Sequence, residues 1–166
     1  YAIGFAAANT AYDTVSGFFK ANSSNIVVLI HTTGDSGANR FISAVFDLSA
    51  QTVLQTISGN ANGTVINTTI EPVGNGWFRC SLTGTIAGTN RYMGFAIGAN
   101  TSNASLFYPN NFGAPVAAQI PAGSNVLVWG MQQEFGVANM SIYIRTTGTF
   151  ATRNADVLTV NVANGF

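Results

Sequence analysis

The chain has 166 residues, of which 47% are hydrophobic and only 7% are charged, and six Lys and Arg residues balance six Asp and Glu residues. Nucleic-acid binding depends largely on Lys and Arg side chains that neutralise phosphates, so this composition argues against a nucleic-acid partner. Net charge keeps protein molecules apart in solution, so a neutral and charge-poor surface favours burial in a homo-oligomer, such as a trimer, or in a larger assembly.

Strand-like segments follow one another along most of the chain. The predicted strands are, in order, Asp13–Ala21 and residues 25–32, 40–48, 52–57, 64–70, 77–83, 91–98 and 126–136. The first two are separated by the polar residues 22–24, which predicts a hairpin. Residues 26–30 are apolar without alternation, so both faces of that strand should be covered. Short strands with Gly-rich and Asn-rich turns, and no helical stripe, predict an all-β fold: an antiparallel β-sandwich or jelly roll.

The most informative stretch is residues 70–82, in which a Gly-Asn-Gly turn leads directly into an alternating strand. Gly74 and Gly76 can adopt the positive φ angles that a tight hairpin requires, and Pro72 is expected to end the segment before them. One face of the following strand carries Phe78, Cys80 and Leu82, and the other carries Trp77, Arg79, Ser81 and Thr83. Residues 126–136 contain the second tryptophan, and we expect Trp77 and Trp129 to pack together in the core between the sheets.

The longest irregular segment, residues 100–119, is the candidate ligand-binding loop. Loops of this length are uncommon in compact domains and are often functional. Aromatic rings can face the apolar side of a sugar ring while amides bind its hydroxyls. The candidate residues are Phe107, Tyr108, Asn110, Asn111 and Phe112. Two alternatives stay open: the rings plug the end of the sandwich, or the loop docks on a neighbouring subunit.

Catalytic and metal-binding sets are hard to assemble from this sequence. His31 and Cys80 are the only residues of their types, so a zinc site lacks ligands and any triad must use His31. The free Cys80 is expected to be a small buried side chain. The acids are scattered singly; if the protein degraded a polysaccharide, Glu71 or Glu134 would be the candidate acid. We expect no cofactor, although a structural calcium ion stays open. No apolar run approaches the roughly 20 residues that span a bilayer, so we expect no membrane partner.

Five segments, in this order along the chain, resemble a sandwich module of bacteriophage virion proteins. They are Phe-Asp-Leu-Ser (46–49), Ile-Glu-Pro-Val-Gly-Asn-Gly-Trp-Phe-Arg-Cys-Ser (70–81), Val-Trp-Gly-Met-Gln-Gln-Glu (128–134), Ser-Ile-Tyr-Ile-Arg-Thr-Thr-Gly (141–148) and Thr-Arg-Asn-Ala-Asp-Val (152–157). Members of that family are phage head-spike or head-fibre domains, and related tail-fibre modules are similar to carbohydrate-binding modules. The resemblance implies a location on the virion surface and supplies no catalytic residues.

These observations lead to one preferred hypothesis and two alternatives. The preferred one is a non-catalytic structural domain of a phage head fibre, capsid decoration or tail appendage, which contacts other virion proteins and adsorbs weakly to host or environmental glycans. The alternatives are a free-standing lectin-like module and a polysaccharide-degrading enzyme. Residues 1–156 are expected to form a single sandwich domain, and residues 157–166 a C-terminal strand or a linker toward a further domain or partner subunit.

Overall fold

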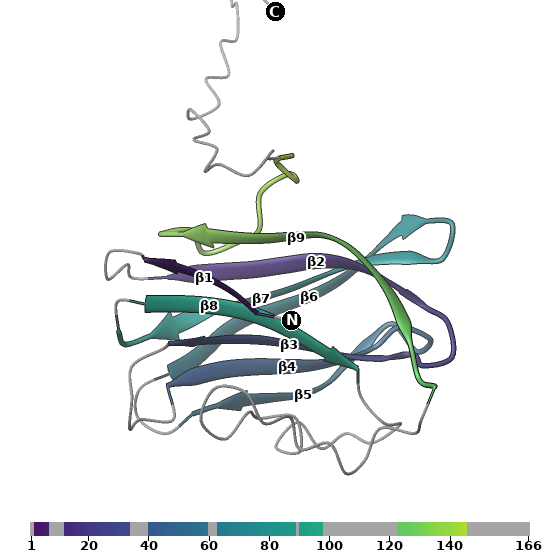
Figure 1. Cartoon of the computed structure of the whole chain (residues 1–166), viewed down its shortest axis with the longest axis horizontal. Helices are drawn as coiled ribbons and strands as arrows, with labels where there is room; N and C mark the ends of the chain where they lie inside the picture. Colours follow the sequence, from purple (N-terminus) through teal and green to yellow (C-terminus); the bar gives the residue numbers. More distant parts are fainter. Residues whose placement is uncertain are drawn as a thin grey trace, which may run out of the picture.

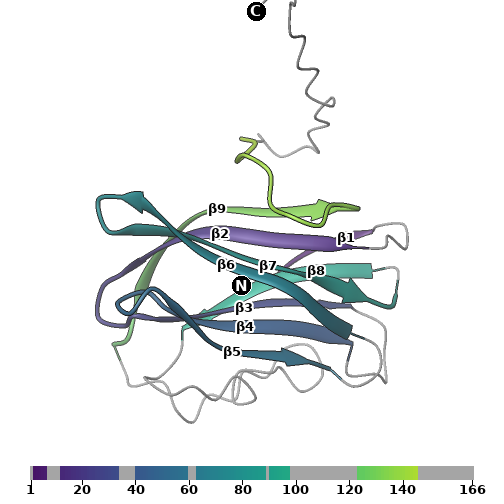
Figure 2. The same cartoon turned by 180° about the vertical axis from the view of Figure 1, so that it is seen from behind.

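The computed structural model describes residues 2–6, 12–33, 40–59, 63–88, 90–97 and 123–145, and these form a β-sandwich (Figures 1 and 2). The five-stranded sheet has the order β1 (Ala2–Ala6), β8 (Asn90–Ile97), β3 (Ile26–Thr33), β4 (Phe41–Asp47), β5 (Thr52–Ser58). The four-stranded sheet has the order β6 (Gly63–Gly74), β7 (Trp77–Ile86), β2 (Asp13–Ala21), β9 (Val126–Phe135). Neighbouring strands run antiparallel. The predicted antiparallel sandwich is therefore confirmed.

Alternation along the strands directs one set of apolar side chains into the space between the sheets. This main core contains Val15, Phe19, Val27, Leu29, Ile42, Ala44, Phe46, Leu48, Cys80, Leu82, Ile86 and Met93. A second cluster, on the opposite face of the five-stranded sheet, contains Ile26, Val28, Ile30 and Val45. Because β3 contributes to both clusters, its two faces are covered, as the apolar run at residues 26–30 predicted.

The prediction that residues 13–32 form a hairpin is wrong, because β2 and β3 belong to different sheets. Both edges of β2 are already paired, one with β7 and the other with β9. The connection instead bonds to the segment before β9: the backbone N–H of Ser24 donates to the carbonyl of Asn125, at 3.1 Å. The Asn125 N–H donates in turn to the Ser23 hydroxyl, at 2.8 Å. The polar turn therefore carries the chain from one sheet to the other.

The hairpin between β6 and β7 is confirmed. Asn75 and Gly76 occupy its two central positions with φ angles of 52° and 75°, the two positive values of a type I′ turn, and Gly74 before them has a φ of 95°. Pro72 does not end the preceding strand as expected, because β6 continues past it to Gly74. β6 lies at the edge of its sheet, where a residue without an N–H is tolerated.

Trp129 lies on the outer face of the four-stranded sheet and is 55% exposed, so its predicted place in the core is wrong. The cause is a β-bulge in β9. Between the pairs Ser16–Gln132 and Phe18–Trp129, β9 contains one residue more than β2, and Gly130 adopts a φ of 58° there. Val128 packs against the core before the bulge and Met131 after it, which leaves Trp129 pointing outward. The predicted place of Trp77 in the core is also wrong: it is half-buried, belongs to neither core cluster and has the same strand parity as Arg79 on the outer face.

Candidate functional site

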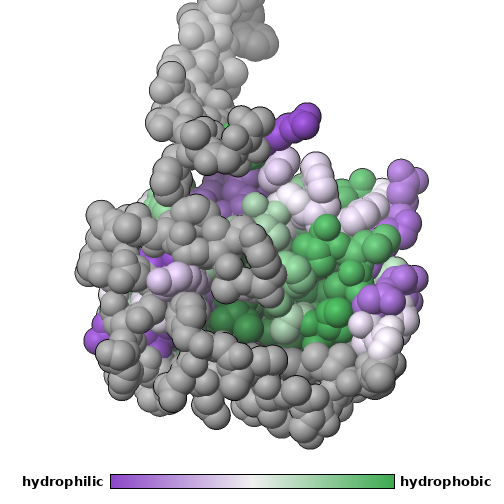
Figure 3. Space-filling model, in the orientation of Figure 1, coloured by the Kyte–Doolittle hydropathy of each residue, from purple (hydrophilic) through white to green (hydrophobic). Residues whose placement is uncertain are grey.

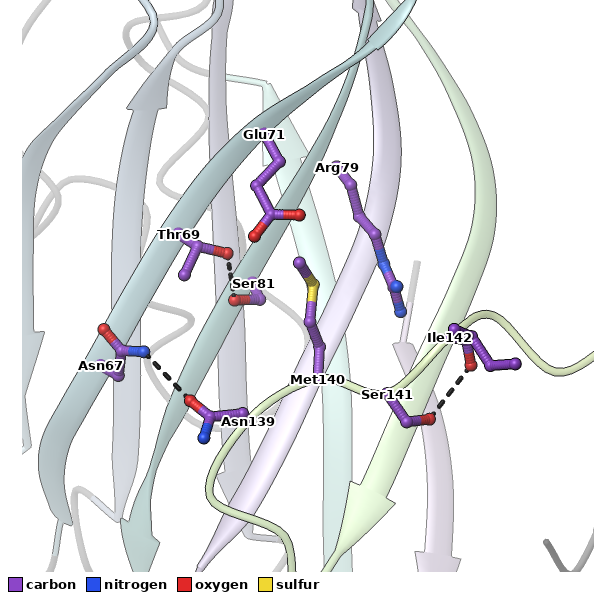
Figure 4. A pocket seen from close by; sticks show the side chains of 9 residues that line it. All are labelled: Asn67, Thr69, Glu71, Arg79, Ser81, Asn139, Met140, Ser141 and Ile142. Carbon is purple, nitrogen blue, oxygen red and sulfur yellow. Dashed lines mark hydrogen bonds between the residues drawn. The ribbon is translucent and has the colours of Figure 1, made fainter. Parts of the chain in front are cut away.

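The outer face of the four-stranded sheet carries a groove of about 250 Å³ (Figure 4). Its lining comes from β6, from β7 and from the segment that follows β9. The lining residues are Asn67, Thr69, Glu71, Arg79, Ser81, Asn139, Met140, Ser141 and Ile142. The β6 and β7 members occupy alternate positions of their strands, so their side chains leave the sheet on the side opposite the core. Most of them are polar, and the groove presents amides, hydroxyls, a carboxylate and a guanidinium.

Two side chains of β9 hold the segment that forms the far wall of the groove. The Ser141 N–H donates to both carboxylate oxygens of Glu134, at 3.0 and 3.2 Å. The side-chain carbonyl of Gln132 accepts from the Ile144 N–H at 2.9 Å, and its amide nitrogen donates to the Ser141 hydroxyl at 3.3 Å. These bonds tie residues 141–144 across the sheet. The wall is therefore fixed by residues of the sheet it covers.

Arg79 is the central charge of the groove and is only 8% exposed. Its Nη2 donates to the Ser16 hydroxyl at 3.2 Å, and its guanidinium carbon lies 5.4 Å from the centre of the Phe18 ring. The Nε–H has no hydrogen-bond partner among the described residues. Burial lowers the pKa of Arg79, while the carboxylates of Glu134 and Glu71 act in the opposite direction. An arginine retains its proton in proteins, so Arg79 is a buried cation with a free donor.

Glu71 lies directly opposite Arg79 in the pairing of β6 with β7. Its side chain is exposed, and in Figure 4 its carboxylate points into the groove. Within the described part of the chain, no ion pair joins Glu71 to Arg79. Below them, the hydroxyls of Thr69 and Ser81 bond to each other at 2.8 Å. The carboxylate and the guanidinium therefore face a shared space without contacting each other.

Three aromatic rings form a cluster beside the groove, composed of Phe18, Trp129 and Tyr143. The ring centres of Phe18 and Trp129 are 4.8 Å apart, and those of Trp129 and Tyr143 are 4.9 Å apart. Phe18 pairs with Arg79 on one side and with Trp129 on the other, so the three side chains form a row across β7, β2 and β9. Gly130 leaves room for the cluster, because a Cβ there would lie 2.9 Å from the Phe18 ring. The outer face thus joins an exposed aromatic surface to a polar groove.

The residues that the sequence suggested for ligand binding, Phe107, Tyr108, Asn110, Asn111 and Phe112, lie outside the described residues. The expected burial of Cys80 is confirmed, and burial raises the pKa of its thiol. His31 is also fully buried, which lowers its pKa to about 3. The described residues include no cluster of three or more His, Cys, Asp or Glu side chains suited to a metal ion, and they include no helix that is long and apolar enough to cross a membrane.

The groove and the aromatic cluster were missed because their residues come from distant parts of the sequence. Phe18 and Trp129 are more than a hundred positions apart, and nothing in the sequence places β2 between β7 and β9. One signal was present: Arg79 and Ser81 alternate with the core residues Cys80 and Leu82, which assigned them to the outer face. Sequence alone did not show that a further segment covers this face.

Neither known protein families nor curated protein sequences contain a match to this chain.

Proposed function

We propose that this chain is a non-catalytic structural domain of a bacteriophage virion surface protein, in a head fibre, capsid decoration or tail appendage, and that it adsorbs to glycans. The observation that carries the adsorption is the aromatic cluster beside the polar groove on the outer face of the four-stranded sheet. Trp129 leaves more than half of its side chain exposed there. Exposed aromatic rings and convergent polar groups form the two halves of a sugar-binding surface.

The two halves match the two chemical sides of a sugar. The C–H face of a pyranose is apolar and packs against a flat ring such as that of Trp129. The hydroxyls both donate and accept hydrogen bonds, so they suit the mixture of donors and acceptors in the groove. The groove is small and open to one side of the sheet, which fits weak adsorption to part of a glycan chain.

The virion location is supported by the order of motifs along the chain and by its neutral, charge-poor composition. Such a surface suits a domain that is assembled in many copies. With little net charge there is little repulsion between copies, so their surfaces can be buried against one another. Hydrophobic side chains gather on the visible surface near the start of β9 and the end of β8 (Figure 3). An assembly that buries this area, for example a trimer, is part of the proposal.

The adsorption is tested with the purified domain on an array of oligosaccharides. We expect binding to a subset of glycans, and we expect Trp129→Ala to abolish it while the fold is retained. Leu54→Ala is the matched control, because Leu54 is an exposed apolar residue of the other sheet. Equal binding by wild type and Trp129→Ala would contradict the assignment of this face.

The virion role has a separate test, because a free-standing lectin-like module would use the same face. Particles are purified and their proteins quantified by mass spectrometry, and light scattering gives the mass of the isolated domain. High copy number in the particles and an oligomeric mass support the proposal. A monomer absent from particles would favour the lectin alternative. If the wild type degraded a bound polysaccharide and Glu71→Gln or Glu134→Gln abolished that turnover, the protein would be an enzyme, and both the virion and the lectin hypotheses would be overturned.

A further inference from the structure

We infer that the groove binds an uncharged hexose unit through two neighbouring hydroxyls, which it holds between the carboxylate of Glu71 and the guanidinium of Arg79. This inference rests on the proposed glycan adsorption and specifies the class of glycan and the residues that select it.

Arg79 is a buried cation with an unpaired donor. The side chain is 8% exposed and its Nε–H has no partner among the described residues, although buried polar groups are nearly always hydrogen-bonded. The Ser16 hydroxyl occupies only Nη2. The Nε atom itself is shielded from solvent, so a ligand oxygen would bond to the part of the guanidinium that lines the groove and add to the few partners of a buried cation.

Glu71 lies where it can bind a ligand together with Arg79. It is the cross-strand neighbour of Arg79, yet within the described chain the two side chains do not form an ion pair. A hydroxyl group donates to a carboxylate and accepts from a guanidinium. Two adjacent hydroxyls can therefore bridge the opposed pair, one donating to Glu71 and the other accepting from Arg79. A ligand that can only accept hydrogen bonds, such as a carboxylate or phosphate, satisfies Arg79 but not Glu71.

The charges on this face disfavour an anionic ligand. Glu71 lines the groove opposite Arg79, and Glu134 holds the wall of the groove through the Ser141 N–H, so the one buried cation lies on a face that also carries two carboxylates. A ligand that carries its own negative charge would be repelled by these carboxylates, because like charges placed close together across an interface disfavour binding. The site therefore selects neutral sugars over uronic acids and sialic acids.

The distance to the aromatic cluster predicts the length of the ligand. Arg79 and Trp129 are two strands apart in the sheet, which corresponds to about 9 to 10 Å. We expect two linked hexose units to cover this spacing better than one. A neutral oligosaccharide with one unit in the groove and a neighbouring unit on Trp129 uses the whole face, so its affinity should exceed that of the monosaccharide.

The inference is tested by titrating the domain with neutral oligosaccharides and with matched oligosaccharides in which one hexose is replaced by the corresponding uronic acid. The wild-type domain should bind the neutral members at least tenfold more tightly. Glu71→Gln keeps the size of the side chain and removes its charge, and Glu71 is exposed, so folding should be unaffected. We expect it to bind neutral sugars about tenfold more weakly and to lose the discrimination against uronic acids. Thr56→Ala, at an exposed site on β5, is the control.

Three outcomes separate this inference from the proposal it rests on. Tighter binding of the uronic acid series by the wild type would overturn the inference and leave glycan adsorption standing. Unchanged affinity and discrimination in Glu71→Gln would also overturn it. Failure of the wild type to bind any glycan on the array would overturn the adsorption itself. Arg79→Lys, which keeps the charge but loses the planar fork, should weaken neutral sugar binding if it folds as the wild type does.

Discussion

Asp13 of β2 and Arg91 of β8 form an ion pair inside the sandwich, and both side chains are fully shielded from solvent. The pair joins the two sheets, because β2 belongs to one and β8 to the other. The Arg91 Nε–H also donates to the Gly88 carbonyl at 3.2 Å. Two strands that share no backbone hydrogen bonds are therefore connected through charged side chains in a predominantly apolar interior.

Breaking this pair from one side should destabilise the fold strongly. Removing one partner of a buried ion pair leaves the other charge uncompensated, at a cost of about 3 to 5 kcal/mol. We expect Asp13→Asn and Arg91→Met each to lower the free energy of unfolding by that amount in urea denaturation. The double variant Asp13→Leu/Arg91→Met should recover most of the loss, because apolar side chains of similar size replace such pairs at little cost. A double variant no more stable than either single variant would show that the pair contributes more than charge compensation.

His31 should make the fold sensitive to acid. Its Nε2 lies 3.0 Å from the Gln133 amide nitrogen and 3.9 Å from Asp13, and burial lowers its pKa from 6.5 to about 3. Below pH 6.5 the unfolded chain binds a proton at His31 and the folded chain does not, so stability falls as pH decreases from 6.5 toward 3. The loss approaches about 1.4 kcal/mol per pH unit within that window.

The measurement for His31 is the free energy of unfolding at several pH values between 7 and 3. Because Asp13 and Arg91 also lie in this interior cluster, the wild type is compared with His31→Gln, and only the difference between their slopes is assigned to His31. We expect His31→Gln to show the shallower slope below pH 6.5. Parallel slopes would mean that His31 is protonated in the folded protein.

The sequence predicted the local structure of individual strands and turns more completely than it predicted which strands pair and in what register. Alternation alone assigned Cys80 and Leu82 to the core, and the Asn75–Gly76 turn is recognisable because few residues accept two successive positive φ angles. Trp129 was misplaced because the bulge at Gly130 changes which side chains of β9 face inward, and a bulge shows only when β9 is aligned against β2. The β2–β3 connection was misassigned because strand adjacency depends on partners distant in sequence.

Gly84 should be far less tolerant of substitution than an exposed glycine in a turn. A Cβ at Gly84 would collide with the backbone carbonyl oxygen of Thr64 and would lie 2.6 Å from Cδ1 of Ile42. Because backbone atoms of a paired strand cannot move aside easily, we expect Gly84→Ala to cost about 3 kcal/mol by overpacking. Gly123 has a φ of 84° and open space around it, so Gly123→Ala should cost only about 1 to 2 kcal/mol of backbone strain. Thermal denaturation of both variants would show which one loses more stability. A larger loss of stability in Gly123→Ala than in Gly84→Ala would contradict the close approach at Gly84.

The two faces of the four-stranded sheet should respond differently to the loss of an aromatic ring. Phe19 faces the main core and is fully buried, so Phe19→Ala should leave a cavity and cost about 3 to 5 kcal/mol. Trp129 is the larger residue but is 55% exposed, and its main contacts are the rings of Phe18 and Tyr143. Aromatic pairs of this kind contribute about 0.5 to 1.5 kcal/mol each, so the loss of two pairs in Trp129→Ala should cost about 1 to 3 kcal/mol. The test is the unfolding free energy of both variants measured under one set of conditions. A loss at Trp129 as large as that at Phe19 would mean that Trp129 supports the fold, and its exposure would then no longer argue for a role in binding.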